Sequence, residues 1–229
     1  MKHSREVIVI LLIICGISTA AIGQIIKGEA ILGLNLTQVE GDEVHGFRKP
    51  GLNIGFGALI PFSKNWDVTM EISYNQKGAQ QKDQYYDSLN SGQILTGAYK
   101  LRLNYVEVPV LVQYTDKGFI TFGAGFSWGR LVGIQEWEHG KRVETTTLSS
   151  GTYDKNDFSY ILDVRIKVYG PLKFGVRYQN SMMKIRTREF SDFAGGTWTR
   201  DQFNKVLTFK LVYIFNEEKS TSNLKAPTP

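Results

Sequence analysis

The stretch that decides the fold is FSYILDVRIKVYGPLKFGVRY, residues 158–178. Its even-numbered positions are apolar throughout except for Gly170, and most of its odd-numbered positions are polar, charged or glycine. Such alternation predicts β-strands that have one apolar and one polar face. Because Tyr169-Gly170-Pro171 interrupts the pattern, the stretch is predicted to be two antiparallel strands, 158–168 and 172–179, joined by a short connection.

The same period of two recurs outside this stretch and predicts six more strands. They cover residues 30–36, 52–60, 66–75, 106–112, 120–128 and 203–215. Several of them are about ten residues long, above the five or six that are usual in soluble sheets. Leu101, Leu103 and Tyr105 precede the fourth strand on the opposite parity, which predicts a β-bulge near Asn104–Tyr105.

The connections between the predicted strands alternate strictly between short and long. The short connections are Pro61–Asn65, Thr115–Lys117 and Tyr169–Pro171, and the long polar ones cover about 38–50, 77–98, 133–156 and 183–200. In an up-and-down barrel this order puts every long loop on one rim, which is the pattern of outer-membrane barrels. We therefore expect an all-β fold, an eight-stranded antiparallel up-and-down transmembrane β-barrel over residues 24–215.

The composition agrees with a sheet protein. Of 229 residues, 42% are hydrophobic and 12% aromatic, and the mean hydropathy is −0.20. These values exclude a bundle of transmembrane helices. They also exclude a long disordered chain, which would be poor in aromatic residues.

The first 23 residues predict export through a cleaved signal peptide. A basic start, Met1–Arg5, precedes the apolar run Val7–Ile17, and the small residues Ser18–Gly23 follow it. The apolar run is too short to span a bilayer. Cleavage at the end of the small-residue segment is favoured, and cleavage after Ala20 is the alternative.

The only cysteine, Cys15, lies inside the predicted signal peptide. The residue before it, Ile14, is larger than a lipoprotein signal requires, so no lipid anchor is expected. The mature chain then has no cysteine and no disulfide to stabilise it. At the other end of the chain, residues 216–229 are polar and are predicted to be a disordered periplasmic tail.

Alternation alone does not decide which face of the barrel points outward. Inward apolar faces would give a soluble, lipocalin-like barrel, whereas outward apolar faces would give a membrane barrel. Aromatic residues bracket the apolar stripes, namely Trp66, Tyr74, Trp128, Phe158 and Tyr160. Such girdles are typical of lipid headgroup layers, so the membrane form is favoured.

In the membrane form, the polar face lines the lumen. The connection lengths predict facing pairs on neighbouring strands: Asp163 with Arg177, Arg165 with Gly175, Glu71 with Gly55, and Glu107 with Gly125. The interior of an eight-stranded barrel is just wide enough for side chains, and a buried charge needs a partner. The sequence therefore predicts a lumen ion network of Glu71, Glu107, Asp163, Arg165 and Arg177, with Lys210 as a further candidate. The alternative is a wet lumen with scattered polar side chains.

The sequence resembles the PorT-type outer-membrane β-barrel proteins over nearly all of residues 24–215. The residues that carry the resemblance are Ala30–Leu36, Gly41-Asp42, Gly46-Phe47, Pro50-Gly51 and Tyr105-Val106-Glu107-Val108-Pro109, followed by a valine-rich strand. The resemblance implies an eight-stranded barrel in the outer membrane of a Gram-negative bacterium. Some members of that family are linked to protein secretion, and the family has no catalytic motif to carry over.

Few residues suggest catalysis or metal binding. His139 beside Glu136 or Glu138 could serve a Ser-His-acid site of a lipid-modifying barrel, provided that a serine converges on it. The alternative is a solvated loop. The remaining loop candidates for a metal, which include His45 and Asp83, do not have the spacing of a ligand set.

The chain is basic, with a net charge of +5. Cations in or beside the predicted outer loops are Lys141, Arg142, Lys184, Arg186, Arg188 and Arg200. Lipopolysaccharide presents phosphates at this height, and Arg and Lys pair well with phosphate. Lys141, Arg142, Arg186 and Arg188 are therefore candidate lipopolysaccharide contacts, and no nucleic-acid partner is expected. Ordinary loop charge is the alternative.

The expected function is structural or interaction-based: a closed barrel that displays four outer loops and is accessory to protein secretion or envelope assembly. Both termini would be periplasmic, and the partners would be outer-membrane lipid and secretion or envelope proteins. No enzyme activity, cofactor or metal is expected. A narrow-pore channel or small-solute carrier is the alternative, and a lipid A-modifying enzyme is a third possibility.

Overall fold

The computed structural model describes residues 26–42, 46–82, 87–88, 94–95, 98–191 and 196–216. The predicted signal peptide lies outside the described residues, as does the predicted tail apart from Asn216. Within the described ranges, no helix is long and apolar enough to cross a membrane.

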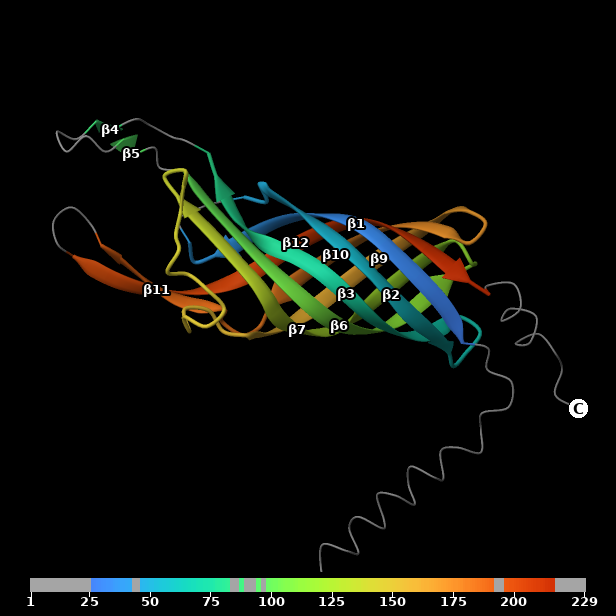
Figure 1. Cartoon of the computed structure of the whole chain (residues 1–229). Coiled ribbons are helices and arrows are strands. Elements are labelled where there is room, and N and C mark those ends of the chain that lie inside the picture. Colours follow the sequence, from blue (N-terminus) through green and yellow to red (C-terminus); the bar gives the residue numbers. More distant parts are fainter. Residues whose placement is uncertain are drawn as a thin grey trace, which may run out of the picture.

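Eight long strands form a closed antiparallel ring (Figure 1). They are β1 (Lys27–Glu40), β2 (Lys49–Pro61), β3 (Trp66–Gln81), β6 (Tyr99–Asp116), β7 (Ile120–Glu138), β9 (Asn156–Tyr169), β10 (Leu172–Ser181) and β12 (Thr197–Phe215). Each pairs with the next, and β1 pairs with β12 to close the ring. The predicted eight-stranded up-and-down barrel is thereby confirmed.

Four short strands lie outside the ring. They are β4 (Asp87–Ser88), β5 (Ile94–Leu95), β8 (Lys141–Arg142) and β11 (Arg186–Ser191). The strand β8 pairs with the end of β7, and β11 pairs with the beginning of β12. As a result, β11 and β12 extend beyond the ring as a two-stranded projection (Figure 1).

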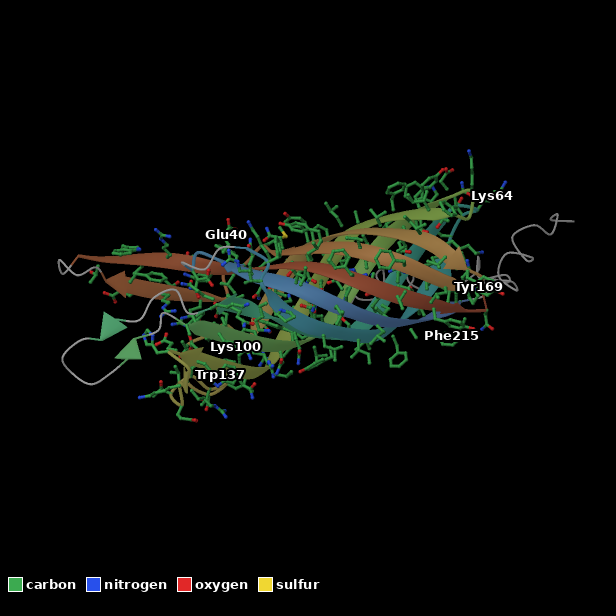
Figure 2. All side chains as sticks on the ribbon, turned by 90° about the horizontal axis from the view of Figure 1, so that it is seen from above. Glu40, Lys64, Lys100, Trp137, Tyr169 and Phe215 are labelled. Carbon is green, nitrogen blue, oxygen red and sulfur yellow. The ribbon has the colours of Figure 1, made fainter. Side chains whose placement is uncertain are left out.

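The two ends of the barrel differ. The turn end holds the three short connections, the start of β1 and the end of β12, and the loop end holds the long connections and the β11–β12 projection (Figure 1). Side chains labelled at the loop end are Glu40, Lys100 and Trp137, and those at the turn end are Lys64, Tyr169 and Phe215 (Figure 2).

The side chains point as the alternation predicts, with apolar residues outward. On β9, Leu162 is 53% exposed and Val164 is 37% exposed, whereas Asp163 between them is 2% exposed. The same inverted pattern runs around the ring and leaves large apolar side chains such as Phe56 and Ile72 exposed. A soluble barrel would bury these residues, so the lipocalin-like alternative is wrong and the outer wall is built for lipid.

A bulge is present near Asn104–Tyr105, but its extra residue lies in the neighbouring strand, β7. The register between β6 and β7 shifts between Asn104 and Tyr105, and the residue left without a partner is Val132 of β7. The strand β6 keeps one parity, so Leu101, Leu103 and Tyr105 point inward and are at most 1% exposed. These apolar side chains are therefore part of the barrel interior and not of its lipid face.

The predicted pairing of the β9–β10 hairpin is observed, with one local difference. Asp163 lies opposite Arg177, and Arg165 lies opposite Gly175. Leu172 pairs with Tyr169 instead of Val168, because a bulge at the turn absorbs one residue.

Two other predicted pairings are wrong because the turns lie further along the chain than expected. Glu71 lies opposite Gly57, not Gly55, since Pro61 still pairs with Asp67. Glu107 lies opposite Gly129, not Gly125. That hairpin turns at Lys117 and Gly118, whose φ angles of 49° and 69° reverse the chain after Asp116.

Candidate functional site

The lumen is crossed by a group of six ionised side chains that we call the central cluster. Its members are Glu29, Glu71, Asp163, Arg165, Arg177 and Lys210, whose side chains are at most 3% exposed. They come from β1, β3, β9, β10 and β12, so the group draws on strands from all round the ring. Three carboxylates and three cations make the central cluster neutral, as buried charges require.

Asp163 is the carboxylate on which the three cations converge. The Nε atoms of Arg165 and Arg177 donate to its two oxygens at 2.9 and 2.7 Å, and the Lys210 ammonium donates to it as well. Loss of Asp163 would leave three cations facing two carboxylates.

The two glutamates share the guanidinium groups of the arginines. Arg177 donates to both oxygens of Glu71, at 2.7 and 2.6 Å. Arg165 reaches Glu71 at 3.0 Å and Glu29 at 2.6 Å. Sequence reasoning missed Glu29 because it lies one residue before the predicted first strand, although its odd number matches the inward parity of that strand.

Gly57 makes room for the two glutamates, because it lies between them in the sheet. A Cβ atom at this position would stand 2.8 Å from Oε1 of Glu29 and 3.1 Å from Cγ of Glu71. The missing side chain therefore allows the two carboxylates to lie close to each other at the arginines.

Glu107 does not join the central cluster; it belongs to a second group nearer the loop end. Lys77 contacts Glu107 at 2.6 Å and Asp157 at 2.9 Å, and its ammonium lies 4.9 Å from the centre of the Tyr105 ring. Asn75 also donates to Glu107, at 2.8 Å. We call Lys77, Glu107 and Asp157 the second cluster. The predicted single network is thus divided into two groups, and the sequence argument missed Lys77 and Asp157.

Apolar side chains pack in the interior on both sides of the charged groups, as a broad layer on the loop side and as a smaller group from three adjoining strands on the turn side. On the loop side the layer consists of Val39, Ala79, Leu101, Leu103, Tyr105, Leu131, Tyr153 and Ile185. On the turn side the group consists of Ile31, Leu59, Val212 and Ile214. Since Tyr153 and Ile185 come from long connections, the loops themselves help to close the loop end.

A polar rim lies above the loop-side layer. Glu136 accepts hydrogen bonds from Tyr99 at 2.8 Å, Thr146 at 2.7 Å and Arg186 at 3.1 Å. Arg186 also donates to the hydroxyl of Tyr153 at 2.6 Å. Burial raises the pKa of Tyr153 to about 12, so the phenol keeps its proton even in moderately alkaline solution.

The four arginines and lysines predicted to contact lipopolysaccharide fall into two environments. Arg186 is paired with Glu136, and Arg188 donates to Glu138 at 2.9 Å, so both face acidic partners of the rim. Lys141 and Arg142 lie exposed on β8, where Arg142 approaches Glu144 at 3.6 Å. Glu138, which accepts from Arg188, is the strand partner of Lys141, so Lys141, Arg142 and Arg188 lie in the same part of the rim.

A family model described as outer membrane protein beta-barrel domain matches residues 30–186. The chain belongs to this family. The match begins in β1 and ends at Arg186, the first residue of β11, and so covers seven of the eight ring strands. A comparison of the sequence with curated proteins gave no match.

Several solved outer-membrane proteins have a similar fold. Ail of Yersinia pestis, in complex with the heparin analogue sucrose octasulfate, has a TM-score of 0.46 and 9% identity, over 83% of this chain and 99% of that one. Neisserial surface protein A has a TM-score of 0.45 and 7% identity, over 82% and 96%. A major outer membrane protein of Thermus thermophilus has a TM-score of 0.45 and 12% identity, over 83% and 100%.

The candidate catalytic acids of this outer-membrane barrel are engaged with arginines. Glu136 and Glu138 are bonded to arginines, as described above. His139 forms the tight turn after β7 with a φ of 51°, and its backbone nitrogen donates to Ala98 at 2.7 Å. His45 and Asp83 lie outside the described residues. Across the described ranges, no group of three His, Cys, Asp or Glu side chains could hold a metal ion.

Proposed function

We propose that the protein is a non-conducting outer-membrane scaffold with a structural or interaction role, which displays its loop end outside the cell. Both termini are then periplasmic, because the start of β1 and the end of β12 lie at the turn end. The observation that carries the proposal is the filled interior: two ionic clusters between two groups of apolar side chains.

A filled interior disfavours transport. A channel needs a continuous path lined by groups that bind an ion and release it. Here the large side chains of Arg165, Tyr105 and Lys77 are all less than 2% exposed. The central cluster is neutral and each of its charges has a protein partner, so this part of the lumen serves stability better than passage.

The loop end is where an interaction would take place. The β11–β12 projection carries a stacked pair of rings, Phe190 and Trp198, with centroids 6.1 Å apart. Trp198 is exposed and Phe190 is half-buried, and aromatic side chains are enriched at protein interfaces. We infer a role accessory to protein secretion or envelope assembly, in line with the resemblance to PorT-type barrels, and no enzyme activity. An unchanged set of secreted and outer-membrane proteins in a deletion strain would exclude this accessory role.

Conductance measurements distinguish the scaffold from a channel. The wild-type protein, reconstituted into planar bilayers, is expected to give no single-channel current, because side chains occupy the lumen. The double variant Asp163→Ala/Arg177→Ala removes one buried pair without changing the net charge, and it is expected to show measurable current. A conducting wild type would contradict the scaffold proposal and favour the narrow-pore alternative.

A further inference from the structure

A group of cations lies on the outer wall of the barrel, at the loop end of β2, β3 and β6. Its members are Arg48, Lys82, Lys100 and Arg102, which we call the wall cations. Lys100 and Arg102 follow the outward parity of β6, since Leu101 and Leu103 point inward. In the described part of the chain, none of the wall cations is paired with a carboxylate.

Arg102 has unused hydrogen-bonding capacity. Its Nη1 atom makes one long contact, 3.4 Å to Oε1 of Gln135, and its Nε atom is buried without a hydrogen-bond partner. A guanidinium group presents five N–H donors in a planar fork that matches a phosphate or a carboxylate. The geometry is that of a donor group held ready for an oxyanion.

The neighbouring side chains concentrate positive charge beside Arg102. The ammonium of Lys100 lies 5.3 Å from the centre of the Trp137 ring, which fixes its position. The ammonium of Lys49, the first residue of β2, donates to the Pro50 carbonyl at 3.3 Å and has no carboxylate partner among the described residues. The charges of Arg102 and Lys100 lie near enough to repel it. An anion bound here would relieve this repulsion.

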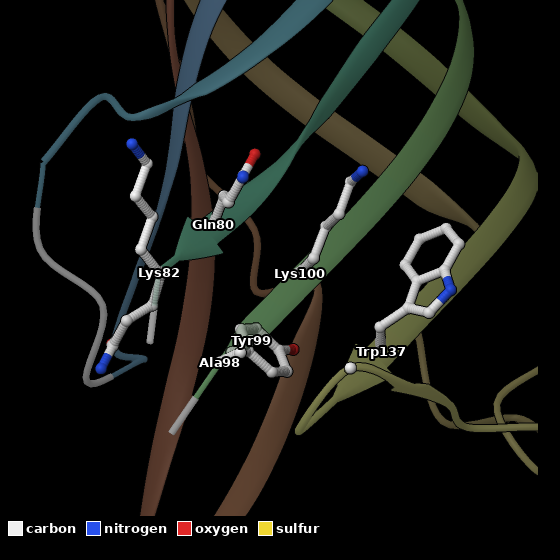
Figure 3. Close-up of a pocket in the computed structure, with 8 residues that line it drawn as sticks. Gln80, Lys82, Ala98, Tyr99, Lys100 and Trp137 are labelled. Atoms are coloured by element: carbon white, nitrogen blue, oxygen red, sulfur yellow. The ribbon is translucent and has the colours of Figure 1, made fainter. Parts of the chain in front are cut away.

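A hollow adjoins the wall cations and gives a ligand room. It measures about 710 Å³ and is lined by residues that include Gln80, Lys82, Lys100 and Trp137, which lie side by side across β3, β6 and β7 (Figure 3). A second hollow of about 420 Å³ shares Gln80 and Lys82 and adds Arg48. The two hollows together connect three of the wall cations.

The height of Arg102 matches a lipid headgroup. The last apolar side chain before it on the outward face of β6 is Val106, which is 39% exposed. Four residues of strand span about 13 Å, and the tilt of barrel strands reduces this to about 10 Å of height. The apolar band reaches higher on the neighbouring strand, where Val132 of β7 is 45% exposed beside Asn104. The polar layer of a bilayer is about 5–7 Å deep on each side, so Arg102, two residues beyond Asn104, lies at the level of lipid headgroups.

We propose that the wall cations form a binding site for the phosphate groups of an anionic lipid headgroup in the leaflet that surrounds the loop end. If the loop end faces outward, as the proposed function states, this lipid is the phosphorylated glycolipid of the outer leaflet. The site differs from the four lipopolysaccharide contacts predicted from sequence, since none of those residues belongs to it.

Lipid titration tests the site on the full-length mature protein in detergent. Native mass spectrometry would follow the binding of lipid A with both phosphates, of lipid A without phosphates, and of inorganic phosphate. The variant Lys100→Gln/Arg102→Gln is expected to bind bisphosphorylated lipid A about tenfold more weakly, since two charge-assisted contacts are lost. The control variant Lys155→Gln/Lys184→Gln removes the same charge from two exposed loop-end lysines that line neither hollow, and it is expected to bind as the wild type does.

Other results would overturn the proposal. Equal losses in both double variants would mean diffuse electrostatic attraction, and displacement of lipid A by millimolar inorganic phosphate would mean a site for free anions. If Lys100→Gln/Arg102→Gln fails to fold, as judged by heat-modifiable mobility on gels, the exposed pair Arg48→Gln/Lys82→Gln replaces it. Unchanged affinity in this second variant would also reject the site.

The orientation on which the proposal rests is tested separately. Because Cys15 is the only cysteine and lies in the predicted signal peptide, single cysteines can be introduced cleanly. A membrane-impermeant maleimide is expected to label Ser149→Cys at the loop end of intact cells but not Lys64→Cys at the turn end. The reverse labelling would refute the proposed orientation, yet the lipid titration would still decide whether the wall cations bind phosphate.

Discussion

Replacement of Asp163 by alanine is expected to destabilise the barrel by about 3–5 kcal/mol, which is the usual cost of leaving buried charges without a partner. Asp163 accepts hydrogen bonds from Arg165, Arg177 and Lys210, so its loss leaves the central cluster with a net charge of +1, from three cations and two carboxylates. The free energy of unfolding would be measured by urea titration of the protein in lipid vesicles. Water that enters the emptied site would reduce the cost.

A double-mutant cycle isolates the pair. Arg177→Ala alone is expected to cost a similar amount, and the double variant should cost less than the sum of the two, because it restores neutrality. The control is the Lys184–Asp201 pair at 3.3 Å, whose side chains are about half exposed. Lys184→Ala should cost at most about 1 kcal/mol. Additive costs for Asp163 and Arg177 would contradict the coupling of these two residues.

Arginine in place of Val164 is expected to cost about 2–4 kcal/mol, which is the range for a cation at the lipid midplane of a barrel. Val164 lies outward in the middle of β9, with Asp163 and Arg165 pointing inward on either side. The control is Val168→Arg, on the same strand and face but close to the turn end, where the same change should cost about 0–1 kcal/mol. The same urea titration measures both variants.

Equal costs at the two positions would show that the membrane does not surround β9 as inferred. If both variants were harmless, the apolar wall would not face lipid at all. The comparison therefore tests the level of the bilayer as well as the direction of the side chains.

The sequence predicted the strands, their faces and one hairpin register, because a period of two is a local property of the chain. The pairing of Asp163 with Arg177 could be predicted from the sequence because only a short connection, Tyr169–Pro171, separates their strands. Where the turn position was misjudged, as for Glu71 and Glu107, the register moved by an even number of residues. An even shift keeps each side chain on the correct face but assigns it the wrong neighbour.

Contacts across the lumen could not be predicted in this way. Lys77 of β3 meets Asp157 of β9, and Glu29 of β1 meets Arg165 of β9, although these strands are not neighbours in the ring. The apolar parity of Leu101, Leu103 and Tyr105 predicts a change of face at a bulge, whereas in the structure these residues are part of an interior layer. Side-chain packing inside a closed ring is a property of the whole assembly.

The membership of the central cluster has a consequence for assembly. Glu29 lies on the first strand of the ring and Lys210 on the last, and both are neutralised by partners from β9. The set of charges is therefore complete only after β1 and β12 have met. An intermediate that enters the bilayer with its seam open carries unpaired charges and is penalised by several kcal/mol for each one. The buried ions thus favour ring closure, because they stabilise the closed barrel relative to every intermediate in which β1 and β12 are not paired.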